Sequence, residues 1–359
     1  MVSAVNLIEG GTLTVLRDCL AAAAKELPPE WRIVALVHDK GLVTEPRIEL
    51  IEVKDAKGSW LRRVLHEWVG FRRLSLILSP DLWLSLHDIT PRVVARRQAV
   101  YCHNPAPFYS ASWREARLDP SFWLFNKFYR FLYGSFIRRN HIVIVQQSWL
   151  RTAFWRLFGP LPIVVAHPSI TLRLEPLPAT APATTMRFLY PSFPRVHKNF
   201  EIICEAARLL EQRCVSGFEV RLTLDGTENS YSRWLHGRYN RTESLRFIGL
   251  QNRDEMAQEY INASVVLFPG KLETWGLPIS EAKAYGKPLL VSDLPYAHET
   301  VGSYERVSFF QPFDVAGLAD LMQQIIDRQW TPTGSLENVP AEPYARDWKE
   351  LWALLVKDL

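Results

Sequence analysis

Two glutamates eight positions apart, with a glycine and a proline between them, constrain this chain more than any other feature. An unbroken helix would hold Glu273 and Glu281 roughly 12 Å apart. Pro278 favours the first turn of a helix and Gly286 favours its end. Glu273 is therefore expected in a loop and Glu281 just inside a helix, where its side chain leans back toward the N-terminus. Both acids are expected to converge at this helix N-terminus, where free backbone N–H groups attract anions.

The residues on both sides extend the pattern. An apolar run that ends in Phe-Pro-Gly, residues 262–270, precedes the first acid, and Tyr-Ala-His-Glu-Thr-Val-Gly, residues 296–302, follows the helix. Carboxylates accept hydrogen bonds from hydroxyls and a helix end binds phosphate, and a nucleotide-sugar carries both groups. The whole segment resembles the Glu-x7-Glu signature of retaining glycosyltransferases of family 4. The resemblance implies the GT-B fold, an α/β architecture of two Rossmann-like, doubly wound parallel-sheet domains facing a cleft.

The length of 359 residues is long for one domain and comfortable for two. Residues 168–185 are rich in Pro, Ala and Thr, which is typical of a linker. We therefore expect an N-terminal domain over residues 1–167 and a C-terminal domain over residues 186–335. The last segment, residues 336–359, is expected to form a helix that returns to the N-terminal domain.

Alternation of short apolar runs with amphipathic runs predicts a parallel sheet in each half. The expected strands are residues 2–7, 31–38, 48–53, 82–86, 99–102, 141–145, 187–190, 218–224, 245–247, 265–268 and 288–291. The expected helices are residues 12–27, 60–72, 120–139, 200–213, 253–260 and 278–285. No internal repeat of solenoid period interrupts this order.

Other sequence signals concern the compartment. No run of about 18 apolar residues predicts a transmembrane helix, and the first residues lack the basic start of a signal peptide. The four cysteines, Cys19, Cys102, Cys204 and Cys214, are scattered without Cys-x-x-Cys spacing. We interpret them as reduced, mostly buried thiols of a cytoplasmic protein.

Lys198 and Asn199 follow the first expected strand after the linker. Members of the family that the chain resembles carry a Lys-Gly or Lys-Asn pair here, which implies an ammonium opposite the donor diphosphate. Many members also have Gly-Arg about five residues earlier, whereas this chain has Ser192 and Phe193 there. Two alternatives remain at this point. Arg195 takes the phosphate role from a shifted loop, or Lys198 works with backbone N–H groups alone.

Glycines mark the other expected donor contacts. Gly226 and Gly249 each end a run that resembles a family strand facing the nucleotide, and a glycine permits close approach of a ligand to the backbone. Gly276 and Leu277 belong to the segment between the two acids. Alone these glycines are ordinary turn residues, and nothing in them identifies the base.

The first half offers fewer candidates. Gly10 and Gly11 lie between the first expected strand and helix, where a turn often approaches substrate phosphate or acceptor at the edge of a parallel sheet. They are not a GxGxxG fingerprint, so no dinucleotide cofactor is indicated. His103 follows an apolar strand at a point where family members often carry a histidine near the donor sugar. His87 and Asp88 end another strand and could face the acceptor, but we do not expect them to form a catalytic dyad.

Charge is unevenly distributed along the chain. The net charge is +4, but residues 60–156 hold 15 Lys or Arg against 5 Asp or Glu, interleaved with many Trp, Tyr and Phe. Such a mixture suits an anionic membrane surface. It would equally suit a nucleic acid, but no nucleic-acid motif accompanies it. Alternatively, the charged residues of this stretch form an ordinary solvent-exposed face and its aromatic residues belong to a core helix.

The resemblance implies a retaining glycosyltransferase. Glu281 would hold ribose hydroxyls and Glu273 donor-sugar hydroxyls, while Lys198, with or without Arg195, would stabilise the leaving diphosphate. The N-terminal half would bind a glycan or lipid-linked acceptor, as in the synthesis of bacterial O-antigen or another surface polysaccharide. The protein would be cytoplasmic, or peripheral on the inner face of the membrane.

No cofactor is expected, because the donor is itself the nucleotide-diphosphate sugar, and no Asp-x-Asp motif predicts an essential metal. Two other functions fit the same fold. A nucleotide-sugar 2-epimerase would bind the same donor without a glycan acceptor. A non-catalytic partner subunit of a polysaccharide complex would be expected to lack Lys198 or one of the two glutamates, and this chain has all three.

Overall fold

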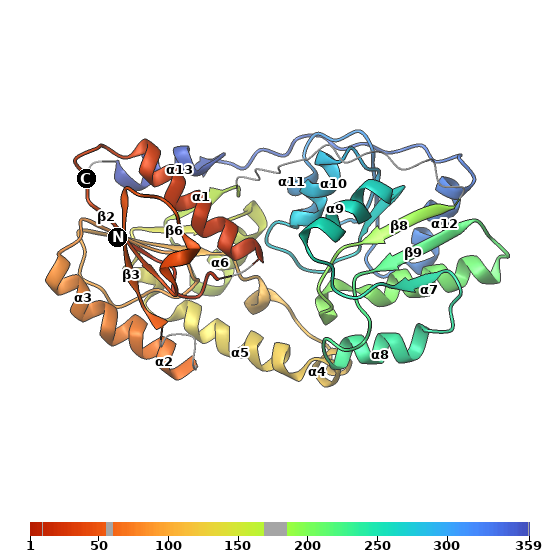
Figure 1. The fold of residues 1–359 in the computed structure, drawn as a ribbon, viewed down its shortest axis with the longest axis horizontal. Coiled ribbons are helices and arrows are strands. Elements are labelled where there is room, and N and C mark those ends of the chain that lie inside the picture. Colours follow the sequence, from red (N-terminus) through yellow and green to blue (C-terminus); the bar gives the residue numbers. More distant parts are fainter. Residues whose placement is uncertain (9, 55–59, 169–184, 358) are drawn as a thin grey trace. The chain divides into compact units, whose positions relative to one another are not determined.

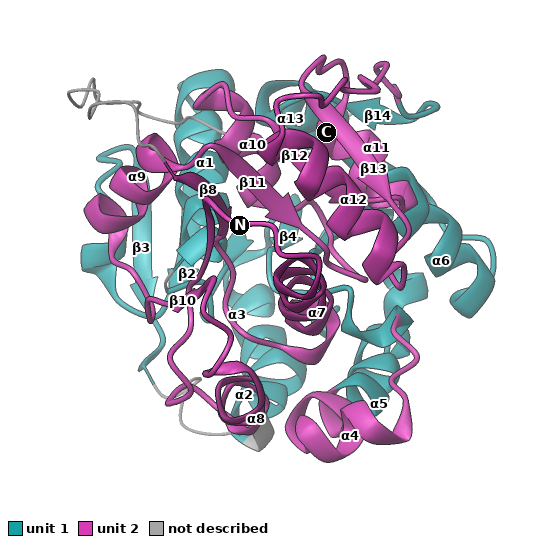
Figure 2. Cartoon of the chain, turned by 90° about the vertical axis from the view of Figure 1, so that its right-hand side faces the viewer, with its two compact units in different colours: residues 1–108, 126–169, 340–359 teal, residues 109–125, 170–339 magenta. Residues whose placement is uncertain are grey.

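The computed structural model describes residues 1–8, 10–54, 60–168, 185–357 and 359. The chain forms two compact units, coloured separately in Figure 2. The first unit comprises residues 1–108, 126–169 and 340–359, and the second comprises residues 109–125 and 170–339. Most of the linker expected at residues 168–185 lies outside the described residues. The division expected from the sequence left residues 109–125 in the N-terminal domain, whereas in the structure they belong to the second unit.

The first unit is built on an eight-stranded sheet in which all paired strands are parallel. The order of the strands is β14-β7-β6-β5-β4-β1-β2-β3. Their bounds are β1 Val2–Ser3, β2 Ile33–Val37, β3 Ile48–Glu52, β4 Leu82–Ser85, β5 Arg97–Cys102, β6 Ile142–Val145, β7 Ile163–Ala166 and β14 Tyr344–Ala345. The central strands are almost entirely buried, as expected of a sheet covered on both faces.

The helices of this unit include segments from both ends of the chain. They are α1 Gly10–Glu26, α2 Trp60–Leu65, a π-helical turn at His66–Gly70, α3 Phe71–Leu78, α6 Ser148–Phe158 and α13 Trp348–Val356. Helix α5, Pro120–Gly134, belongs to this unit from residue 126 onward. In Figure 1, α13 lies beside α1 although more than 300 residues separate them in the chain. Trp352 of α13 is buried in the core around α1, and its indole N–H donates to the Cys19 carbonyl at 3.0 Å.

The second unit holds a six-stranded parallel sheet of order β10-β9-β8-β11-β12-β13. Its strands are β8 Met186–Tyr190, β9 Phe218–Leu222, β10 Leu245–Phe247, β11 Val265–Phe268, β12 Leu289–Ser292 and β13 Val307–Phe310. Its helices are α4 Trp113–Leu118, α7 Phe200–Gln212, α8 Ser230–Tyr239, α9 Arg253–Asn262, α10 Leu277–Ala284, α11 Pro295–Val301 and α12 Val315–Ile326. The apolar face of α7 packs against α12.

Each sheet contains a point where the direction of winding reverses. The chain runs from β1 outward to β3 and then returns to β4 on the other side of β1. In the second sheet it runs from β8 to β10 and returns to β11 on the other side of β8. The loops that follow the two strands at such a switch point diverge, and the crevice between them is where open α/β sheets bind ligands.

The two parallel sheets confirm the α/β class, but several expected elements have different bounds. The first strand was expected to reach residue 7 but ends at Ser3, because a turn closed by the Leu7 N–H and the Ala4 carbonyl at 3.1 Å follows it. Gly10 and Gly11 were expected in a turn but form the start of α1. The helix expected over residues 60–72 continues to Leu78 through the π-helical turn. Strands β7, β13 and β14 were not anticipated, and β14 lies where the sequence predicted only a C-terminal helix.

Candidate functional site

Lys198 and Glu273 meet at the switch point of the second sheet. Lys198 ends a 3₁₀ turn, Val196–Lys198, in the loop after β8, and Glu273 lies in the loop after β11. The Lys198 ammonium donates to Glu273 Oε1, and the two side chains are 20% and 12% exposed. The pair is thus shielded from bulk water but still open to a ligand. An ammonium and a carboxylate in this position can bind a phosphate and a sugar hydroxyl, respectively.

Local bonds fix the backbone that carries Lys198. The Tyr190 hydroxyl, from the end of β8, donates to the Lys198 carbonyl at 2.7 Å. Asn199 adopts the left-handed conformation, with φ +60°, which asparagine tolerates better than most residues. Its buried side-chain amide donates to the carbonyls of Pro269 and Pro312 at 3.1 and 2.8 Å. Asn199 therefore ties the start of α7 to the loops after β11 and β13, which explains the asparagine beside the lysine.

Glu281 lies in the second turn of α10 and has a different partner. Its Oε2 accepts a hydrogen bond of 2.6 Å from the Tyr260 hydroxyl. Burial raises the pKa of the Glu281 carboxyl above its usual value, although the Tyr260 bond partly offsets this effect. A buried carboxylate with one hydroxyl donor retains the capacity to accept further hydrogen bonds from a ligand.

The loop before α10 requires a glycine. Gly276 is the N-cap of α10 at φ +83°, and a Cβ there would lie 3.2 Å from Cζ of Phe268. Leu277 and Pro278 open the helix, and Gly286 follows its end at φ +62°. The helix thus begins and ends where the sequence predicted. No side chain caps its first turn, and the Ile279 N–H donates to the Gly276 carbonyl at 2.9 Å.

Two further cations flank Lys198, and each is paired with an acid from residues 109–125. Nη1 of Arg195 lies 3.2 and 3.3 Å from the two carboxylate oxygens of Asp119. Nζ of Lys271 lies 2.7 Å from Oε1 of Glu115. Burial opposes the charged form of Glu115, but bonds from Lys271, Tyr109 and Ser112 together hold its pKa below the usual value.

His197 lies between these charges. Its ring stacks on Phe122 with centroids 4.8 Å apart. Burial, together with the charges of Lys198, Arg195 and Lys271, holds the pKa of His197 well below its usual value. The ring is therefore neutral and acts as an aromatic surface that supports the loop.

The other predicted donor glycines lie at the ends of β9 and β10. Gly226 has φ +95°, and a Cβ there would lie 3.0 Å from Cβ of His236. Gly249 has φ +70°, and a Cβ would lie 3.3 Å from a carboxylate oxygen of Asp225. Both positions therefore exclude larger residues through packing within the unit.

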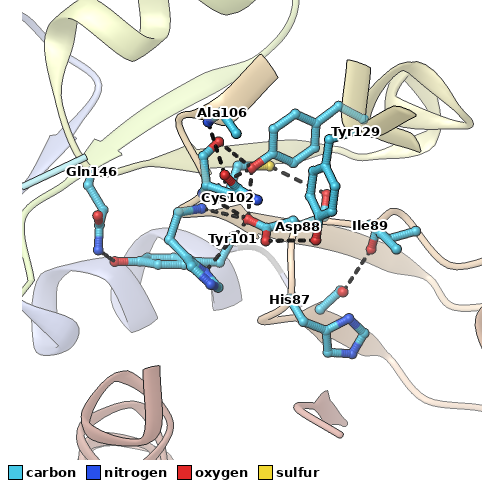
Figure 3. A network of polar contacts seen from close by, with 12 residues as sticks. His87, Asp88, Ile89, Tyr101, Cys102, Ala106, Tyr129 and Gln146 are labelled. Atoms are coloured by element: carbon cyan, nitrogen blue, oxygen red, sulfur yellow. Dashed lines mark hydrogen bonds and ion pairs between the residues drawn. The ribbon is translucent and has the colours of Figure 1, made fainter. Parts of the chain in front are cut away.

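At the switch point of the first sheet, Asp88 organises a buried network (Figure 3). Asp88 has φ +71° and follows β4, and its side chain is 5% exposed. Oδ1 accepts from the backbone N–H groups of His103 and Asn104 at 2.8 and 3.2 Å and from the Tyr133 hydroxyl at 2.8 Å. Burial and the nearby Asp88 charge raise the pKa of Tyr133, so its hydroxyl remains a donor. All the donors to this oxygen are neutral.

His103 follows β5, as predicted, and lies against this network. Its Nδ1 is 3.7 Å from Oδ1 of Asp88, and its side chain is 17% exposed. The histidine and Asp88 line a cavity of about 280 Å³ in the first unit together with Asn6, Thr12, Arg63, Asn104 and Tyr129. Hydroxyl, amide and imidazole groups that converge on one cavity suit a sugar, whose hydroxyls both donate and accept.

His87 and Asp88 bind different partners. His87 Nδ1 lies 2.8 Å from Oε1 of Glu67, and both side chains are almost completely buried. Glu67 comes from the π-helical turn, a feature frequent at functional sites. Gly10 and Gly11 form the first turn of α1 rather than a separate loop, and the neighbouring Thr12 lines the cavity.

Several site residues were not recognised from the sequence: Asp88 as the centre of a network, Tyr190, Tyr260, Glu115, Asp119 and Lys271. Two of them carried a local signal. Ser112 and Glu115 have the Ser-x-x-Glu spacing of a capping box, and Asp119 precedes a proline, which is typical of a helix start. These signals predict helix ends but not the cations that the two acids bind.

Comparison with known proteins is consistent with this geometry. Residues 184–339 match the model of the family described as glycosyl transferases group 1. This stretch is a glycosyl transferases group 1 domain. The domain contains Lys198, Glu273 and Glu281.

Solved structures share the fold of both units. The sucrose-phosphate synthase from Thermosynechococcus elongatus is 17% identical, with a TM-score of 0.67 over 91% of this chain and 89% of its own. WaaG, a glycosyltransferase involved in lipopolysaccharide biosynthesis, is 13% identical, with a TM-score of 0.64 over 99% of this chain and 94% of its own. This likeness confirms the GT-B fold that the sequence predicted.

A curated relative matches part of the chain. The glycogen synthase of Mycobacterium tuberculosis (strain ATCC 25618 / H37Rv) is 25% identical over 195 residues. The match covers 53% of this chain and 47% of the relative, so it spans about half the relative's length.

Proposed function

We propose that this protein is a retaining glycosyltransferase of family 4 that transfers a sugar from a nucleotide-diphosphate sugar to a glycan or lipid-linked acceptor. The observation that carries the proposal is the Lys198–Glu273 pair at a sheet switch point, within the matched domain. Lys198 would face the leaving diphosphate, Glu273 the hydroxyls of the donor sugar, and Glu281 the ribose. In the first unit, His103 would bind a sugar hydroxyl in the cavity that it lines with Asp88.

The chemistry needs no carboxylate nucleophile. The acceptor oxygen attacks the anomeric carbon on the face that the diphosphate leaves, and the bond from that carbon to the phosphate oxygen breaks. The electron pair of the broken bond goes to the diphosphate, whose growing negative charge Lys198 stabilises. The proton of the acceptor hydroxyl passes to a phosphate oxygen. Side-chain cations supply the positive charge in this scheme, so we expect no essential metal.

A thermal-shift screen against UDP-, GDP-, dTDP- and CMP-sugars tests donor binding, because a ligand that binds only the native state raises its apparent stability. HepE from Anabaena, 17% identical with a TM-score of 0.58, has been solved in complex with UDP-glucose, which makes UDP-sugars the first to test. We expect a shift with a diphosphate donor and none with a CMP-sugar, which has a single phosphate. Proton NMR of the product would then show whether the anomeric configuration is retained. No shift with any diphosphate sugar, or an inverted product, would contradict the proposal.

We place the reaction at the inner face of a bacterial membrane, in surface-polysaccharide synthesis. Helix α5 supports this placement, because Leu124, Phe128 and Phe131 are 63%, 44% and 64% exposed at a helical spacing of four and three residues. Exposed Lys127 and Arg130 lie on the same helix. An apolar stripe flanked by cations suits an anionic lipid surface. Among the described residues, no helix has both the length and the apolar character to cross a membrane.

Co-sedimentation with liposomes tests this surface. We expect binding to anionic vesicles at low salt and weaker binding at 1 M salt, where screening shortens to about 3 Å. Replacing Phe128 and Phe131 by serine should reduce binding, whereas the same change at Leu336, an apolar residue 88% exposed in the second unit, should not. Equal sedimentation with anionic and neutral vesicles would rule out the membrane surface and leave the enzyme assignment intact.

A further inference from the structure

Residues 109–125, which we call the strap, form part of the second unit although the residues before and after them belong to the first. The strap contributes α4 and the first turns of α5. Within the second unit it contacts α8, the loop after β11 and the loop that carries Lys198. The contacts with the Lys198 loop are the ones that matter here. Asp119 binds Arg195, and Phe122 stacks on His197.

The charges around Lys198 balance one to one. Three cations, Arg195, Lys198 and Lys271, are each paired with one acid: Asp119, Glu273 and Glu115. The loops that bear them are joined by a bond of 2.8 Å from the Lys271 N–H to the His197 carbonyl. A donor diphosphate adds negative charge to a cluster that is already neutral, so it must draw a cation away from its acid.

The three pairs differ in how easily they can exchange. Glu115 accepts bonds from Tyr109, Ser112 and Lys271, and the Lys271 side chain is only 11% exposed. The Arg195 side chain is 39% exposed and contacts Asp119 through one terminal nitrogen. Arg195 can therefore turn to a ligand with the smallest rearrangement.

We propose that Asp119 is the exchange partner of Arg195 and limits the affinity for the donor's diphosphate. Arg195 binds Asp119 when the site is empty and a phosphate oxygen when the donor is bound. After transfer, Asp119 competes for Arg195 again and speeds the release of the nucleoside diphosphate. The inference rests on the proposed function, because it requires a diphosphate ligand beside Lys198.

Asp119 also caps a helix, so the test must separate its charge from its capping role. Its Oδ1 accepts from the Phe122 N–H at 3.1 Å and from the Ser121 hydroxyl at 2.9 Å, at the start of α5. Asparagine and serine cap helices about as well as aspartate. Asp119→Asn and Asp119→Ser therefore remove the charge and keep the cap.

Two effects of Asp119→Asn oppose each other. Freeing a half-exposed arginine costs side-chain order, which would weaken binding by about a factor of two. Releasing Arg195 from its acid strengthens the bond between Arg195 and the phosphate more, by roughly three- to tenfold at a partly exposed site. We therefore expect tighter binding overall.

Titration calorimetry and stopped-flow release of UDP test the exchange. We expect Asp119→Asn and Asp119→Ser to lower the Kd of UDP about threefold or more and to slow its dissociation. In an Arg195→Gln background the same substitutions should leave Kd unchanged, since a double-mutant cycle isolates the pair. Asp314→Asn is the matched control, because Asp314 caps α12 through the Gly317 N–H at 2.9 Å. It should leave Kd unchanged.

The outcomes separate the two proposals. If the wild-type protein binds neither UDP nor GDP or dTDP, the proposed function fails. If it binds one of them and Asp119→Asn leaves the Kd unchanged or raises it, the exchange is wrong and the proposed function stands. Equal tightening in the Arg195→Gln background would also overturn the exchange, because it would show a general effect of charge.

Discussion

The two sheets satisfy a buried acid at their switch points in different ways. At the first, the Asp88 carboxylate accepts hydrogen bonds from two backbone N–H groups and from the hydroxyls of Tyr133 and Tyr129, all of them neutral and part of the fold. At the second, Glu273 and Asp119 bind the side-chain cations Lys198 and Arg195. Backbone donors cannot leave their acceptor without unfolding, whereas a long cationic side chain can. The first switch point is therefore a fixed scaffold, and the second can exchange partners with a ligand.

The largest expected effect is on turnover at the exchangeable site. Lys198→Ala should lower kcat by about 10²–10³-fold, because its charge matters most as negative charge develops on the diphosphate. Donor affinity should change much less. Steady-state kinetics with the donor identified by thermal shift gives both values, and Lys349→Ala, at an exposed lysine of α13, is the control. A loss confined to KM would show that Lys198 binds the donor without acting on the leaving group.

One substitution at both switch points tests the comparison directly. Asp88→Asn should lower the free energy of unfolding by about 2–3 kcal/mol, because the hydrogen bonds to Asp88, three at Oδ1 and one at Oδ2, lose their charged acceptor. Asp119→Asn breaks a partly exposed ion pair and should cost at most about 1 kcal/mol. Tyr133→Phe removes one donor from Asp88 and should cost about 1 kcal/mol.

Urea unfolding of the three variants gives these values. We expect Asp88→Asn to lose the most free energy of unfolding and the other two variants to lose less. Equal losses at positions 88 and 119 would show that the two acids are held equally firmly, and the distinction between scaffold and exchangeable site would be lost.

The smallest expected effects come from replacing Glu281. The replacement should weaken donor binding but stabilise the protein. Glu281→Gln should weaken donor binding about tenfold, since hydrogen bonds to a charged acceptor are worth about 1.5–3 kcal/mol. The same change should stabilise the protein at neutral pH. Burial raises the pKa of this carboxyl, so the folded state disfavours the charged form at pH values above that raised pKa.

The stability gain should disappear as pH falls below the ordinary value of 4.5, where the carboxyl is protonated in both folded and unfolded states. Melting curves from pH 4 to 8, with calorimetric donor titrations at pH 7, check both signs. Unchanged donor affinity would remove Glu281 from the site, and destabilisation at neutral pH would show that the Tyr260 bond needs the charge.

Local signals in the sequence were sufficient to predict the elements that carry Lys198, Glu273 and Glu281. Proline at the start and glycine at the end predicted α10 to within one residue, because a helix end depends on the conformations that these two residues allow. The same signals placed Glu273 in the loop, and the apolar pattern of residues 200–213 placed the start of α7 just after Lys198. Hydrophobic periodicity predicted most of the strands, since burial of a strand is visible in its own residues.

These local signals could not predict which side chains bind one another. The pairing of Asp119 with Arg195 joins residues 76 positions apart, and Asp88 binds a tyrosine 45 positions away. Nothing in a local window distinguishes an acid that only caps a helix from one that also binds a distant cation. Glu115 and Asp119 both carried helix-capping signals. Capping alone accounts for these acids, so the sequence offered no reason to look for their partners Lys271 and Arg195.

The sequence by itself determined the alternation of strands and helices, the loop with Glu273, the helix with Glu281 and the position of Lys198 just before α7. Periodicity and turn chemistry act over a few residues, so they can be read from the chain. The tertiary structure decided the order of the strands, and that order decides which loops meet at a switch point. It also decided that residues 109–125 join the second unit and bring Asp119 to Arg195. These outcomes depend on packing between segments far apart in the chain, which no local pattern encodes.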